Sequence, residues 1–283
     1  MSNPKAPRQR GFSQVDVFTS TALLGNPLAV VHDGTGLSDA QMAQFARWTH
    51  LSETTFLLPP THPEADYRVR IFTPGGELPF AGRPTLGSCH VWLQAGGKPR
   101  RDDLVVQECS IGLVPIRRGA RLAFAAPPTT VERVDAELLH RVYAALGLEP
   151  ARVQEAAWLS NGFAQLVLRV DSAATVLALK PDHSALKGLA KVGVVGPHPA
   201  GGELDFEVRF FAAAIGINED PVTGSLNANV ARWLIDNGRA PARYVAAQGT
   251  AMGRAGRIHV QRDDAGTWIG GDVAGCIAGS VTI

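Results

Sequence analysis

Cysteine is scarce in this chain, which has three among its 283 residues: Cys89, Cys109 and Cys276. Their odd number and wide spacing argue against a disulfide framework and against a CxxC metal-binding pair. We therefore expect reduced thiols packed in a hydrophobic core. The eight histidines show no zinc-motif spacing such as HExxH, so the sequence predicts no metal site.

A surplus of charge is also lacking, because 27 Lys and Arg residues balance 26 Asp and Glu residues for a formal net charge of +1. Without a basic stripe, nucleic acid is not an expected partner. The first ten residues, MSNPKAPRQR, contain no apolar stretch and resemble neither a signal peptide nor a membrane span. They predict a flexible tail on a cytoplasmic protein that has no membrane partner.

The chain has enough apolar residues for a large core, since 45% of its residues are hydrophobic. Its 30 glycines and 19 prolines predict many turns. A length of 283 residues corresponds to about two domains. We therefore expect a compact soluble protein with two domains.

The first half predicts alternating strands and helices. Gly25-Asn26-Pro27 marks a turn between the first two strands, and Ser38 with Gln41 forms a capping box that begins a helix. A second helix follows the sequence RPTLGS and ends at Gly96-Gly97. Strands are expected at 14–18, 28–31, 54–58 and 67–72.

The second half repeats this order. Asp135 is expected to cap a helix that ends at Gly147, and another helix should follow EDPVTGS and end at Gly238. The stretch 248–257 reads as a tight turn between late strands rather than a phosphate loop, because no Lys-Ser/Thr pair follows its glycines. Strands are expected at 165–170 and 204–211, and a capped helix at 170–179.

One short pattern occurs twice, as RPTLGS at 83–88 and as DPVTGS at 220–225. Each copy has a charged residue, a proline and a Gly-Ser pair, follows an alternating strand and opens a long apolar helix. The spacing of 137 residues between Ser88 and Ser225 indicates an internal repeat. It predicts two similar α+β domains, 11–126 and 127–283, with a cleft between them and a last strand free to pack back on the first domain.

A Gly-Ser pair at a helix start can hold an anion. The first turn leaves backbone N–H groups unpaired, the helix dipole is positive there, and glycine lets a ligand approach. Plain capping is the alternative, because Asp followed by Pro commonly begins a helix. Arg83 argues against capping in the first copy, since arginine is a poor N-cap residue.

Five stretches in serial order resemble the signatures of the PhzF-like family, the phenazine-biosynthesis isomerases and their relatives. They are VDVFTSTALLGNPLAVV, LSETTFLL, RIFTPGGELPFAGRPTLGS, GINEDPVTGS and QGTAMGRAGRI, from about residue 14 to the C-terminus. The resemblance implies a diaminopimelate epimerase-like fold, in which each of two domains is a sheet curled into a barrel around a central helix and the active-site cleft lies between them. It also implies cofactor-independent proton transfer and a homodimer.

The resemblance assigns roles to individual residues. Glu53, in the SET motif, would be the acid/base that moves a proton between carbon atoms, a reaction that asks for one sheltered carboxyl group. Without the resemblance, a lone Glu before a strand would be interpreted as solvated surface. Asp220 would be the second-domain acid that contacts the substrate or assists the transfer. The expected substrate-binding residues are Gly82, Arg83, Gly224 and Ser225.

One position departs from the family pattern, which usually has histidine where this chain has Arg83. Arginine cannot act as a base, but its planar fork pairs well with a carboxylate. Two alternatives follow: Arg83 clamps an acidic group of the substrate, or it pairs with Asp220 and closes an inactive site.

The sequence therefore predicts a cofactor-independent isomerase acting on a small carboxylate-bearing molecule, with Glu53 as the acid/base. One alternative is a two-base epimerase or racemase that acts through Glu53 and Asp220. Another is a non-catalytic protein that binds a small acid, in which Arg83 replaces a catalytic histidine. A two-thiol racemase is disfavoured, because the place that matches Cys89 in the second repeat is Leu226.

Overall fold

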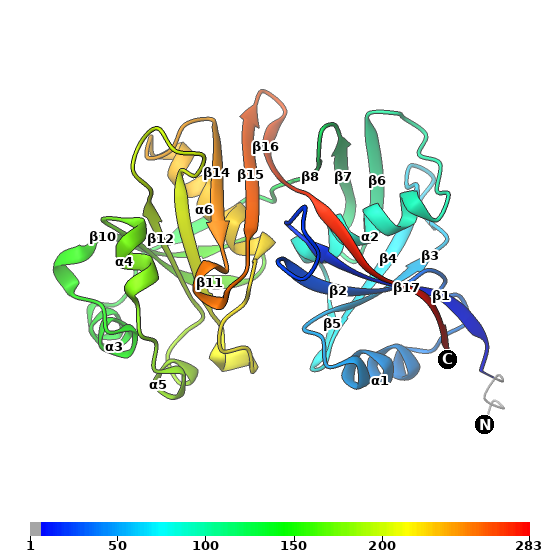
Figure 1. Cartoon of the computed structure of the whole chain (residues 1–283), viewed down its shortest axis with the longest axis horizontal. Coiled ribbons are helices and arrows are strands. Elements are labelled where there is room, and N and C mark those ends of the chain that lie inside the picture. The colour runs from blue at the N-terminus through cyan, green and yellow to red at the C-terminus, as the bar shows by residue number, and fades with distance from the viewer. Residues whose placement is uncertain (1–6) are drawn as a thin grey trace. The chain divides into compact units, whose positions relative to one another are not determined.

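The structure of the protein, a computed structural model, describes residues 7–283. The chain forms two compact units (Figure 1). Unit 1 comprises residues 7–23, Pro27–Phe124 and Asp272–Ile283, and unit 2 comprises Leu24–Asn26 and Ala125–Gly271. Each unit has a hydrophobic core of its own. Within the described residues, no helix is both long enough and apolar enough to cross a membrane.

Unit 1 is a mixed sheet with two helices. Its strands are β1 Gln9–Val17, β2 Asn26–Val31, β3 Thr54–Leu58, β4 Tyr67–Thr73, β5 Gly76–Leu78, β6 Leu104–Cys109, β7 Gly112–Arg118, β8 Leu122–Ala125 and β17 Val273–Thr282; its helices are α1 Asp39–Thr49 and α2 Gly82–Gln94. Neighbouring strands follow the order β17, β1, β2, β3, β4, β6, β7, β8, and β5 pairs with β4. The red strand β17 lies beside the blue strand β1 in Figure 1, because the end of the chain returns to pair with its beginning.

Unit 2 is a second mixed sheet. Its strands are β9 Thr130–Glu132, β10 Val153–Ser160, β11 Ala164–Val170, β12 Val192–Pro197, β13 Phe206–Phe211, β14 Arg243–Gln248, β15 Gly256–Asp263 and β16 Gly266–Gly271. Its helices are α3 Ala136–Leu146, α4 Ala173–Ala178, α5 His183–Lys187 and α6 Gly224–Asp236, with short 3₁₀ turns at Pro150–Arg152, Ala213–Ile215 and Thr250–Met252. Strands β9 to β16 neighbour one another in numerical order.

The two units repeat one another strand for strand. In each, a parallel pair (β2–β3 or β11–β12) is followed by an antiparallel pair (β3–β4 or β12–β13) and by a second parallel pair (β4–β6 or β13–β14). Two antiparallel pairs complete each series, β6–β7 and β7–β8 in unit 1 and β14–β15 and β15–β16 in unit 2. The predicted α+β class with two similar halves is confirmed, whereas closure of either sheet into a barrel stays a prediction.

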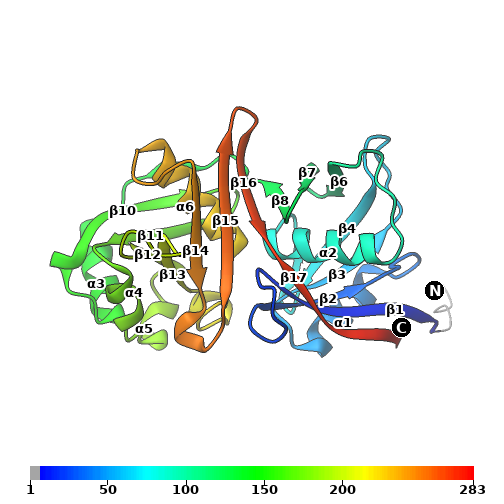
Figure 2. The same cartoon turned by 45° about the horizontal axis from the view of Figure 1, so that its top comes forward.

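A helix of 13 residues connects the second parallel pair in each unit, α2 in unit 1 and α6 in unit 2. Helix α2 packs on β1, β3 and β6 (Figure 2), and α6 packs on β10, β15 and β16. In both helices, nine of the residues are buried. Such burial on all sides is typical of a helix at the centre of a unit rather than on its surface.

The predicted helix caps are confirmed. Ser38 and Gln41 form the capping box of α1, and the Asp135 side chain accepts a hydrogen bond in the first turn of α3, which ends at Gly147 in the left-handed conformation. Strand β13 differs from its expected alternation of faces, because all six of its residues are buried. The charged Arg209 can be buried because it forms an ion pair with Glu219, in which the Nε–Oε1 distance is 2.8 Å.

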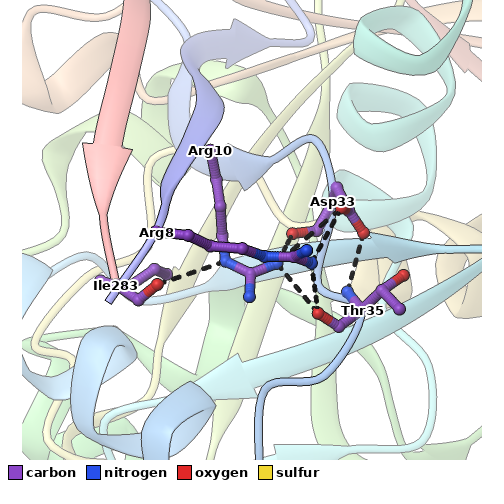
Figure 3. Close-up of polar contacts among 5 residues, drawn as sticks. All are labelled: Arg8, Arg10, Asp33, Thr35 and Ile283. Atoms are coloured by element: carbon purple, nitrogen blue, oxygen red, sulfur yellow. Dashed lines mark hydrogen bonds and ion pairs between the residues drawn. The ribbon is translucent and has the colours of Figure 1, made fainter. Parts of the chain in front are cut away.

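The prediction of a flexible tail over the first ten residues is wrong for its last two. Gln9 and Arg10 begin β1, and the Arg10 side chain is only 5% exposed. Its guanidinium donates hydrogen bonds to the backbone oxygens of Asp33, Thr35 and Ile283 (Figure 3). A buried guanidinium is tolerated here because these carbonyl oxygens replace its water. Residues 1–6 lie outside the described part.

We expect the substitution Arg10→Met to lower the free energy of unfolding by about 1–3 kcal/mol, because three hydrogen bonds from a buried guanidinium to backbone oxygens are then lost. Urea denaturation followed by circular dichroism measures this change. Arg8→Met is the matched control, since the Arg8 side chain is half-exposed and also binds Asp33 and Thr35. Equal losses in the two variants would contradict the role assigned to Arg10.

Candidate active site

The central helices of the two units begin at equivalent glycines. Gly82 is the first residue of α2 and Gly224 the first residue of α6, so the two helix starts are 142 residues apart. The two Gly-Ser pairs, 137 residues apart, therefore do not occupy the same position in their helices. Counted from the helix start, the place that corresponds to Cys89 is Ala231 rather than Leu226.

The first Gly-Ser pair does not lie at a helix start. Gly87 and Ser88 are the sixth and seventh residues of α2. A Cβ atom at Gly87 would lie 2.5 Å from the Leu28 side chain, and the Ser88 hydroxyl donates to Thr55 at 2.9 Å. This pair serves helix packing, and the first turn of α2 is made by Gly82 and Arg83 instead.

Glu53 lies in the connection between α1 and β3, and its side chain is 14% exposed. Arg83, in the first turn of α2 and 5% exposed, donates to the same oxygen of Glu53 through Nε at 2.8 Å and Nη2 at 2.5 Å. The interpretation of Glu53 as solvated surface is thus wrong. The structure brings Glu53 and Arg83 together, a pair that neither alternative for Arg83 had foreseen.

The ion pair orients Glu53 and stabilises its ionised form, because a cation within hydrogen-bonding distance favours the carboxylate over the neutral acid. Both partners lie beside the start of α2, where Ala81 as N-cap provides no side-chain acceptor. The positive end of the helix dipole adds to this stabilisation. Unit 1 therefore presents a sheltered carboxyl group that an arginine holds in one orientation.

Asp220 lies four residues before α6 and is 8% exposed. Its Oδ1 accepts from Asn26 Nδ2 at 2.9 Å and its Oδ2 accepts from the Thr223 hydroxyl at 2.6 Å. Gln248 completes the network by donating to the Asp220 backbone oxygen and to the Thr223 hydroxyl. The neutral donors of Asn26 and Thr223 thus help to hold this carboxylate in one orientation.

The first turn of α6 has no side-chain cap, because the N-cap Thr223 directs its hydroxyl to Asp220. Gly224 and Ser225 occupy the first two helical positions. Asn161 donates to the Ser225 backbone oxygen at 3.0 Å, and Gln165 donates to its hydroxyl at 3.4 Å. This turn has the free N–H groups and the positive dipole that an anion needs.

The cysteines do not take part in this chemistry. All three are free thiols, and Cys89 and Cys109 are buried. Burial raises the pKa of Cys89 to about 12 and raises that of Cys109. Such thiols do not form the thiolate that a cysteine base requires. Across residues 7–283, no group of three or more His, Cys, Asp or Glu side chains could hold a metal ion.

The sequence analysis missed Asn26, which it placed only in a turn. Asn26 is 1% exposed, and besides Asp220 its side chain binds the backbone oxygen of Val222 at 2.7 Å. The available signal was the asparagine itself, because this residue type is seldom buried without specific hydrogen bonds.

Three comparisons with known proteins point to the same class of protein. The chain is 33% identical to "Antisense-enhancing sequence 1" of Schizosaccharomyces pombe, over 96% of this chain and 98% of that one. It is 35% identical to trans-2,3-dihydro-3-hydroxyanthranilate isomerase of Pseudomonas aeruginosa, over 89% of this chain and 90% of that one. The crystal structure of a phenazine biosynthesis protein of the PhzF family from Bacillus anthracis matches in fold with a TM-score of 0.84 at 21% identity, over 98% and 100% of the two chains.

These matches define a class of two-unit α+β proteins to which named isomerases belong. Within that class, the chain belongs to the family described as "Phenazine biosynthesis-like protein", whose model matches residues 15–275. The assignment to the PhzF-like family of isomerases, made from five short motifs, is confirmed.

We expect Asn26→Ala to lower the free energy of unfolding by about 1–3 kcal/mol, because Asp220 and the Val222 carbonyl each lose a buried donor. Urea denaturation followed by tryptophan fluorescence measures the change. The matched control is Asn237→Ala, which removes one partly buried hydrogen bond to the Trp233 oxygen. An Asn26 variant no less stable than this control would show that the Asp220 network does not depend on Asn26.

Proposed function

We propose that this protein is a cofactor-independent isomerase that moves a proton between carbon atoms of a small carboxylate-bearing substrate, with Glu53 as the acid/base. The proposal rests on the sheltered Glu53 carboxylate, which Arg83 holds at the start of α2 in a chain related to named isomerases. Proton abstraction from carbon needs a base of fixed orientation that is protected from water. The geometry around Glu53 meets both needs.

The reaction requires one carboxyl group that changes its protonation state twice. The Glu53 carboxylate takes a proton from one carbon, and the electron pair of that C–H bond moves into the unsaturated system of the substrate. The neutral carboxyl group then returns the proton to a different carbon. Atoms and electrons balance within the substrate, so no oxidant or reductant is consumed.

Arg83 positions the base in this scheme, because it fixes Glu53 through the Oε2 atom. A substrate group that competes for the guanidinium weakens this hold and makes the Glu53 carboxylate a stronger base.

Asp220, Gly224 and Ser225 are the proposed substrate anchors of unit 2. Asp220, as a hydrogen-bond acceptor, suits a hydroxyl or ammonium group of the substrate. The backbone N–H groups at the start of α6 suit its carboxylate. A substrate with both kinds of group is consistent with the compound for which the Pseudomonas aeruginosa relative is named.

The experiment that tests this proposal is incubation with trans-2,3-dihydro-3-hydroxyanthranilate in deuterated buffer, followed by NMR. We expect rearrangement with uptake of deuterium at carbon, and a loss of roughly 10²- to 10⁴-fold in rate for Glu53→Gln, which cannot carry the proton. Glu77→Gln is the matched control, because Glu77 also pairs with an arginine of unit 1, Arg70. Full activity of the Glu53 variant would rule out Glu53 as the acid/base.

Arg83→His restores the residue usual in the family pattern. We expect this variant to turn over the dihydro-hydroxyanthranilate faster than the unaltered chain, because histidine holds Glu53 less tightly than a guanidinium does. Rates for both proteins at saturating substrate measure the difference. A slower variant would show that Arg83 contributes to binding or catalysis in its own right.

Binding without catalysis is a second candidate, favoured by the same ion pair, because a carboxylate held by arginine is a weaker base. In that case the aromatic acid of the same skeleton, 3-hydroxyanthranilate, would bind while no deuterium entered the dihydro compound. A two-base epimerase would instead place deuterium at a stereocentre and leave the double bonds unmoved.

A further inference from the structure

The repeat assigns a counterpart to Glu53 in unit 2, and this residue is Lys191. Glu53 directly precedes β3 and Lys191 directly precedes β12, and these strands hold the same place in the two sheets. Thr54 pairs with Ala29 and Phe72, just as Val192 pairs with Leu166 and Phe211. One unit thus has an acid at this position and the other has a base.

The position faces the start of the central helix. In unit 1, Thr55 contacts Ser88 in the interior of α2, and Glu53, two residues earlier on the same face, reaches Arg83 in the first turn. In unit 2, a Cβ atom at Gly193 would lie 2.5 Å from the side chain of Leu226, which already belongs to the first turn of α6. Lys191, two residues before Gly193 on the same strand face, therefore has its backbone beyond Leu226 in the direction of the start of α6.

A second contact supports this placement independently of the repeat. The Lys191 backbone oxygen accepts a hydrogen bond from Leu166 at 2.9 Å, so Lys191 and Gln165 are neighbours on adjacent strands. Gln165 in turn donates to the Ser225 hydroxyl in the first turn of α6. Lys191 therefore lies beside a residue that touches the proposed anion-binding turn.

The charge of Lys191 has no counter-ion in the described part of the chain. Its side chain is half-buried, its ammonium nitrogen lies 3.2 Å from the centre of the Phe163 ring, and no acidic side chain pairs with it among residues 7–283. Burial lowers its pKa. Partial burial of an ammonium group beside an aromatic ring alone costs free energy, and a bound anion would reduce this cost.

We infer that Lys191 binds the carboxylate group of the substrate at the start of α6, together with the N–H groups of Gly224 and Ser225. This inference rests on the proposed function, since it assumes that the α6 turn holds the substrate. It assigns the two units opposite tasks. Glu53 moves the proton, and Lys191, at the matching place in the repeat, neutralises the anion that keeps the substrate in position.

The test uses the full chain with lysine-selective ¹³C labelling and follows the Cε signal of Lys191 by NMR. The sequence contains five lysines, Lys5, Lys98, Lys180, Lys187 and Lys191, so the signals can be assigned by substitution. On addition of 3-hydroxyanthranilate, we expect the Lys191 signal to shift and the pKa of its ammonium to rise, because a bound carboxylate favours the charged form. The other four signals should stay in place.

Affinity measurements by calorimetry with the same acid complete the test. Lys191→Met should weaken binding by about tenfold to a hundredfold, and Lys191→Arg should keep most of it, because a positive charge is retained. Lys187→Met on α5 is the control and should bind unchanged. Circular dichroism verifies the folding of each variant.

An unmoved Lys191 signal at saturating acid, or equal affinity of the Met variant and the unaltered chain, would overturn the inference. Neither result would bear on the role of Glu53, which the deuterium experiment tests. Conversely, a shift at Lys191 in a protein that exchanges no deuterium would support the anion anchor and refute the isomerase. The two proposals therefore fail separately.

Discussion

Both units depend on one topological constraint, the pairing of two parallel neighbouring strands, β4 with β6 and β13 with β14. Parallel neighbours cannot be joined by a tight hairpin and need a crossover, which is usually a helix. Here the crossover helices α2 and α6 are buried along most of their length. Their first turns consequently lie at matching places in the two sheets, and the candidate catalytic and binding groups gather there.

The two candidate carboxylates, one in each unit, are held in different ways. Glu53 is paired with a cation, Arg83, whereas Asp220 accepts hydrogen bonds from the neutral groups of Asn26 and Thr223. The first arrangement keeps a carboxylate ionised until a ligand competes for the arginine. The second holds an acceptor in place through hydrogen bonds. This difference suits a mobile proton in unit 1 and a fixed anchor in unit 2.

Much of the fold could be predicted from local patterns. The capping box at Ser38, the cap at Asp135 and strands such as β3 depend on neighbouring residues, so the sequence alone indicates them. Strand β17, by contrast, has two glycines and no clear alternation of polar residues, and it exists because β1 offers it a partner about 270 residues away in the chain. The two Gly-Ser pairs were matched by residue type alone, whereas the helix starts at Gly82 and Gly224 determine which positions of α2 and α6 correspond.

The amino-acid sequence alone was enough to predict the family, the two similar halves and the candidate residues Glu53, Arg83, Asp220 and Gly224, because these depend on residue types in short motifs and on the order of those motifs. The contacts of each side chain became known only from the folded chain. Folding paired Glu53 with Arg83, bound Asp220 to Asn26 and placed the Lys191 ammonium over the Phe163 ring. The physical reason is that long-range strand pairing and burial select the neighbours of a charged group, and no local pattern of residues encodes them.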